Sequence, residues 1–78
     1  MRDFNSNLIE RWDTVFIVAC HPYSDLKPYD GRIGVVQTVD IQCAGVRLDD
    51  VDNLVWVYPH EVLLERKGGF YVIHSNSG

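Results

Sequence analysis

Two segments constrain the fold of this 78-residue chain more than any other feature. The first, Asp30–Val36, has two glycines three residues apart at the head of a β-branched run. This is typical of a strand that starts from a tight turn and lets another backbone approach closely. The second, Asn53–Val62, is an aromatic run stopped by Pro59 and then resumed, which indicates two strands joined by a single helical turn. Together they predict a small barrel.

The length and composition limit the chain to one small globular domain. At 78 residues a single core barely offsets the chain entropy, and the 46% of hydrophobic residues argues against disorder. We expect residues 1–12 to form an N-terminal extension, residues 13–73 to form the barrel, and residues 74–78 to form a polar tail.

Runs of β-branched and aromatic residues predict an all-β, antiparallel fold of five or six strands. The expected strands cover residues 14–20, 32–42, 46–48, 54–58, 62–66 and 70–73. The last two are predicted to form a C-terminal hairpin through Lys67-Gly68-Gly69. In the N-terminal extension, Asn5-Ser6-Asn7 offers capping oxygens to a short helical turn in which Leu8 and Trp12 share a face.

Alternation assigns the faces of two strands. In strand 32–42 the odd-numbered residues, such as Ile33 and Val35, are expected to face the core. In strand 54–58 we expect Val55 and Val57 to point inward, which leaves Trp56 exposed.

This order of strands, long first loop and late helical turn resembles the SH3-like barrel over residues 13–66. Gly31–Val36 is similar to the Gly-x-x-Gly-x-Val element of KOW-type barrels. Tyr58–Val62 is similar to the aromatic-Pro-x-x-aliphatic element of signalling-type SH3 domains. The chain lacks the Ala-Leu-Tyr-Asp-Tyr stretch and the adjacent Trp pair that accompany recognition of proline-rich peptides. The resemblance therefore implies the fold and leaves the ligand open.

The charge favours a basic partner. The formal net charge of −4 argues against general affinity for phosphate backbones, which depends on surplus Lys and Arg. Asp49, Asp50 and Asp52 crowd one predicted turn with only Arg47 close by as a counter-charge. Aspartates are also ordinary turn formers, so a purely solvated turn is the plainer alternative.

Aromatic residues give a second indication of a protein interface, because exposed rings are enriched at such surfaces. The predicted protein-binding residues are Tyr23, Tyr29, Asp49, Asp50, Asp52, Trp56 and Tyr58. The alternative for each ring is that it covers the small core as a lid.

No catalytic, cofactor or metal motif is present in the sequence. Cys20 and Cys43 do not have the spacing of a zinc site with any histidine, and we expect both thiols to be reduced. The chain has no apolar run of membrane-spanning length and no signal-peptide core, so a cytoplasmic location is expected.

These observations predict a non-enzymatic protein interaction module that docks onto a basic partner. It would act as a subunit of a larger assembly or as a small inhibitor covering a basic surface. The sequence does not decide whether the chain also forms homo-oligomers. The alternative is a KOW-like nucleic-acid or ribosome-associated protein that uses Arg32, Arg47, Arg66 and Lys67. A contiguous basic face would favour that alternative.

Overall fold

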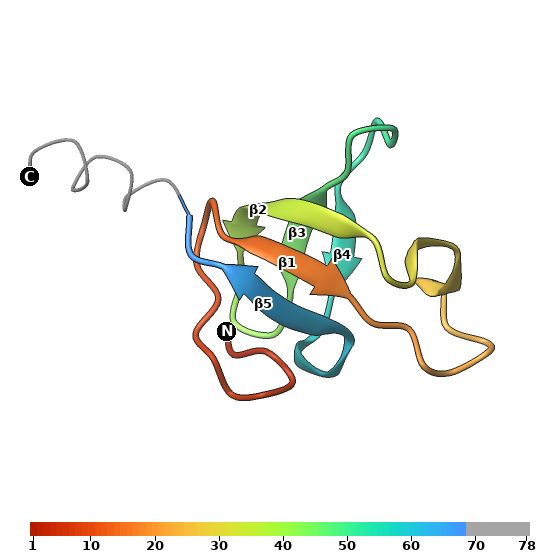
Figure 1. The fold of residues 1–78 in the computed structure, drawn as a ribbon, viewed down its shortest axis with the longest axis horizontal. Helices are drawn as coiled ribbons and strands as arrows, with labels where there is room; N and C mark the ends of the chain where they lie inside the picture. The colour runs from red at the N-terminus through yellow and green to blue at the C-terminus, as the bar shows by residue number, and fades with distance from the viewer. Residues whose placement is uncertain (69–78) are drawn as a thin grey trace, which may run out of the picture.

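The computed structural model describes residues 1–68, which form a five-stranded antiparallel sheet. The strands are β1 (Thr14–Ile17), β2 (Ile33–Val39), β3 (Ala44–Arg47), β4 (Val55–Val57) and β5 (Val62–Arg66), in the order β4-β3-β2-β1-β5. Two 3₁₀ helices, η1 (Lys27–Tyr29) and η2 (Pro59–Glu61), lie in the β1–β2 and β4–β5 connections. Figure 1 shows the long β1–β2 connection projecting to one side of the sheet. The sheet is not closed, because β4 and β5 are its two edges within the described residues.

The all-β class, the antiparallel pairing and the helical turn at Pro59 are confirmed. Pro59 begins η2 because its fixed φ suits the first helical position and its missing N–H would have had no helical partner there. Strands β1, β2 and β4 are shorter than predicted, β3 starts two residues earlier and ends one residue earlier than predicted, and β5 has the predicted bounds. The predicted strand 70–73, its hairpin and the polar tail 74–78 lie outside the described residues.

All five strands contribute to one apolar core. Its buried members are Ile9, Val15, Ile17, Ala19, Leu26, Val36, Ala44, Val46, Leu48, Val55, Val57 and Val62. Val55 and Val57 point inward, as predicted, while Trp56 between them is half exposed. The alternation on β4 is therefore confirmed.

The predicted facing of β2 is wrong at its start. Gly34 and Val36 are buried, whereas Ile33 and Val35 are exposed. The register with β3 shifts between Val36 and Thr38, so a bulge changes which residues face the core partway along the strand. Because β-branched residues occur on both faces of this strand, the sequence does not show which of them face the core.

The predicted helical turn at residues 8–12 is also wrong. The N-terminal segment is a tight hairpin-like turn with an isolated antiparallel bridge between Arg2 and Leu8. The Asp3 carboxylate accepts the backbone N–H groups of Asn5 and Asn7, which offers these residues an alternative to helical hydrogen bonds. Trp12 has a φ of 76°, which no right-handed helix contains.

The same N-terminal segment covers the free edge of β5. The Phe4 N–H donates to the Val62 carbonyl (3.0 Å), and the Leu64 N–H donates to Oδ2 of Asp3 (2.6 Å). Figure 1 shows this red segment beside the blue β5.

The two glycines of the Asp30–Val36 segment serve different purposes. Gly31 has a φ of 79°, a conformation that side chains rarely adopt, although space around it is open. Gly34 lies against β3, where an added Cβ would be 2.7 Å from Cδ2 of Leu48 and 2.8 Å from the Arg47 carbonyl oxygen. Gly34 therefore allows the close approach of two strands.

We expect Gly34→Val to destabilise the fold by about 2 kcal/mol or more, because the Arg47 backbone cannot move aside without disturbing β3. Chemical denaturation measures the loss. Ile33→Val, at the exposed neighbouring position, is the matched control and should change the free energy of unfolding little. Equal stability of Gly34→Val and wild type would contradict the close approach.

A second prediction concerns acid stability. Burial, the largest influence on the Asp3 carboxyl, raises its pKa, but hydrogen bonds from Leu64, Asn7 and Asn5 together bring the pKa below the ordinary 3.8. Since the folded pKa is the lower one, the stability from Asp3 is complete above pH 3.8 and is lost as the pH falls through the folded value.

The stability advantage of wild type over Asp3→Asn should therefore be constant near neutral pH and shrink in acid. Urea denaturation of both proteins between about pH 2 and pH 7 measures this difference. A difference that does not change across this range would show that the Asp3 carboxylate does not hold the segment on β5.

Candidate functional site

Trp56 lies on the outer face of β4 with 50% of its surface exposed. It pairs with Gly45 of β3, and a Cβ added at Gly45 would lie 3.4 Å from Cη2 of Trp56 and 3.0 Å from Cδ1 of Leu54. The indole therefore rests over the glycine and beside Leu54. Because Gly45 has no side chain, the Trp56 ring can approach the backbone of β3 there while Trp56 stays half exposed.

Tyr58 continues this outer row beyond the end of β4. It is two residues after Trp56, so alternation in extended chain places both rings on one face. Tyr58 is 49% exposed, and its ring stacks on His60 of η2 with centroids 6.3 Å apart and planes 17° apart. The exposed aromatic row therefore runs from β4 into η2.

The three predicted aspartates lie in the turn between β3 and β4, and all are exposed. Asp50 forms a salt bridge with Arg32 at the start of β2. The hydrogen bond between them raises the pKa of the Arg32 guanidinium and lowers the pKa of the Asp50 carboxyl. No salt bridge reaches Asp49 or Asp52 from residues 1–68. These two carboxylates leave the turn negatively charged.

The two predicted loop tyrosines differ from each other. Tyr23 is 88% exposed, with His21 as its aromatic neighbour at 5.6 Å between ring centroids. Tyr29 is partly buried and packs against the core, which favours a structural role as a lid. The structure joins neither ring to Trp56 by an aromatic pair within the described residues. The seven predicted residues thus include one aromatic row, one adjoining acidic turn and two separate loop rings.

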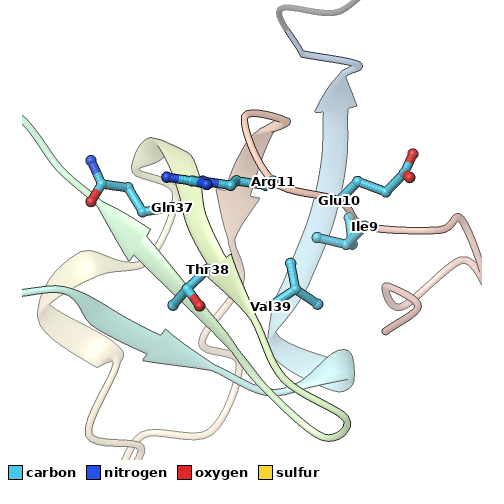
Figure 2. A pocket seen from close by; sticks show the side chains of 6 residues that line it. All are labelled: Ile9, Glu10, Arg11, Gln37, Thr38 and Val39. Atoms are coloured by element: carbon cyan, nitrogen blue, oxygen red, sulfur yellow. The ribbon is translucent and has the colours of Figure 1, made fainter.

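The sequence prediction missed an open groove between the N-terminal segment and β2. It is lined by Ile9, Glu10, Arg11, Gln37, Thr38 and Val39. Figure 2 shows Ile9 beside Val39 at one end and Arg11 near Gln37 at the other. Trp12, 47% exposed, follows this segment with the Arg11 guanidinium 4.6 Å from its ring centroid. The missed signal is Asn5-Ser6-Asn7: these turn-forming residues were interpreted as the cap of a helical turn that contains Leu8 and Trp12.

The four cations of the nucleic-acid alternative are not equally available. Arg32 is paired with Asp50, and Lys67 donates to Glu10 and to the buried Asp13. Burial, the largest influence on the Lys67 ammonium, lowers its pKa, but the bonds to Asp13 and Glu10 raise it above the ordinary value. Two of the four positive charges are thus already offset by carboxylates.

Within residues 1–68 no group of three or more His, Cys, Asp or Glu side chains is placed to hold a metal ion. Cys20 is exposed and Cys43 is half-buried, and both are free thiols. In the same part of the chain, no helix combines the length and apolar character needed to cross a bilayer.

Comparison with known proteins gives no family assignment. Protein-family models, curated proteins and solved structures were all searched, and none matches this chain. Functional inference therefore depends on the geometry of the described residues.

Proposed function

We propose that this chain is a non-enzymatic protein interaction module that docks onto a basic surface of a partner protein. The docking surface consists of Trp56 and Tyr58 on the outer face of β4, with Asp49, Asp50 and Asp52 in the adjoining turn. The half-exposed indole of Trp56 seated on Gly45 is the observation that carries the proposal. Large aromatic rings held rigidly at a surface are frequent energetic centres of protein interfaces.

We further propose that the fold belongs to the SH3-like barrels. Three features support this proposal: the strand order β4-β3-β2-β1-β5, the long connection after β1, and the 3₁₀ turn between β4 and β5. A barrel of this kind presents side chains from several strands around one small core. The partner then selects the module by its exposed rings and charges rather than by the fold itself.

The charge pattern supports a protein partner over nucleic acid. Asp49 and Asp52 add negative charge next to the aromatic row, and the pairing of Arg32 and Lys67 with carboxylates weakens the basic alternative. A basic surface on the partner would gain favourable long-range attraction during approach. The module would then serve as a subunit of an assembly or as an inhibitor that covers a basic site.

Trp56→Ala should weaken binding to the partner by about 2 kcal/mol or more, as truncation of a central aromatic anchor does. Affinity capture from the source cells with mass spectrometry first identifies the partner, and calorimetry then compares the variants. Trp12→Ala is the matched control, because it removes another half-exposed indole from outside the surface. Circular dichroism must show that both variants stay folded.

Should Trp56→Ala bind as tightly as wild type while folded, the proposed surface is wrong. Should it unfold, Trp56→Phe keeps a smaller aromatic ring at this position and still tests the site. We then expect intermediate affinity from a folded protein.

Charge reversal in the turn should act on the rate of association. Asp49→Lys with Asp52→Lys removes the carboxylates that have no salt bridge and leaves the Arg32–Asp50 pair in place. Association with the partner should slow and lose salt dependence, because peripheral charges act mainly by steering. Stopped-flow association at several salt concentrations measures this. If the association rate and its salt dependence do not change, the acidic turn is not part of the docking surface.

A further inference from the structure

The two edges of the sheet differ in how their backbone groups are satisfied. Along β5, Phe4 donates to the Val62 carbonyl, and Leu64 donates to Asp3. Along β4, whose only neighbouring strand is β3, no hydrogen bond from elsewhere in residues 1–68 reaches the backbone of Val55–Val57. Within residues 1–68, one edge is therefore covered by the chain itself, and the other is open.

The open edge has the geometry of a strand template. Backbone groups of an edge strand alternate between facing the neighbour and facing away. Val55 and Val57 are only 6% and 0% exposed, whereas Trp56 is 50% exposed, so Trp56 is the residue of β4 that can present its N–H and C=O groups outward. Tyr58 extends this conformation with φ −103° and ψ 165°. Pro59 then ends the edge, since it has no N–H to donate.

We propose that the free edge of β4 binds an extended basic segment of the partner protein as an added strand. This inference rests on the proposed function and specifies how the docking occurs. Main-chain hydrogen bonds to the edge would supply part of the affinity, and side chains at alternate positions would supply the selectivity. Because β4 is only three residues long, the aromatic row and the nearby charges have to contribute strongly.

The charges around β4 favour cationic side chains on that segment. Asp49, Asp50 and Asp52 precede the strand and Glu61 follows it in η2. The nearby cations are Arg47, at the end of β3, and Arg32, just before β2, which is already paired with Asp50. The acidic side chains near β4 therefore outnumber the basic ones.

The aromatic row also favours cationic side chains on the bound segment. An added strand places alternate side chains on the outer face of the sheet, next to Trp56 and Tyr58. Lysine or arginine at those positions would lie close enough to the ring faces for cation–π attraction. A second copy of the chain is the poorer occupant, because it brings the same acidic turn and another net charge of −4.

The test uses the full chain and a heptapeptide of alternating lysine and threonine, acetylated and amidated. Two control peptides accompany it: the same sequence N-methylated at alternate residues, and a glutamate–threonine peptide. At saturating basic peptide, exchange of the Trp56 amide should slow by about fivefold or more, as for a newly bonded amide. Amides of β1 should not change. Neither control peptide should give this protection.

Each other outcome is decisive. If the N-methylated peptide binds equally well at Trp56 and Tyr58 without protection of β4, strand addition is wrong, whereas docking of a basic partner on the aromatic row stands. If the basic peptide does not bind, or shifts resonances only elsewhere, the edge site is wrong, and the Trp56→Ala test with the captured partner then judges the proposed function separately. Protection that grows with protein concentration in the absence of peptide would identify a second copy as the occupant and overturn the proposal.

Discussion

The buried carboxylate of Asp13 is the contact on which the arrangement of the sheet edges depends. With 2% of its surface exposed, Asp13 accepts the N–H groups of Glu10 and Gly68 and the ammonium of Lys67 at 2.8–2.9 Å. A buried carboxylate is costly unless hydrogen bonds compensate it, and here they come from both ends of the described chain. Gly68 has to be a glycine, because an added Cβ would contact the Trp12 carbonyl and lie 2.8 Å from the Asp13 nitrogen. This joint fixes the segment before β1 against the end of β5.

Asp3 provides a second attachment between the N-terminal segment and β5. Its carboxylate shapes the N-terminal turn through Asn5 and Asn7 and also accepts the N–H of Leu64, so one buried group both folds the segment and attaches it to β5. Exposed edges are sites of unwanted pairing, and this segment removes one of them. The two edges therefore differ. The β5 edge is covered by the chain's own backbone and carboxylates, whereas β4 has aromatic rings on its outer face, acids at its start and no backbone partner along its edge within residues 1–68. Strand addition at β4 is inferred from this difference.

The parts of the fold that the sequence predicted are those with a local signal. Pro59 after an aromatic strand marked η2, the Val55–Trp56–Val57 alternation marked the inward face of β4, and Gly34 marked the close approach to β3. The facing of Ile33 and Val35 was missed because a bulge near Gln37 changes the phase within a run that is β-branched on both faces. The attachment of the N-terminal segment to β5 was missed for a different reason. It depends on contacts between residues about sixty positions apart, such as Asp3 with Leu64, which no local pattern reports.

Native-state hydrogen exchange of the isolated chain tests this account most directly, because it reports on each edge amide without a partner present. We expect slow exchange for the amides of Leu64 and Gly68, which donate to Asp3 and Asp13, and fast exchange for the outward amide of Trp56. Slow exchange throughout β4 together with fast exchange at Leu64 would contradict it, because β4 would then be the covered edge and β5 the open one.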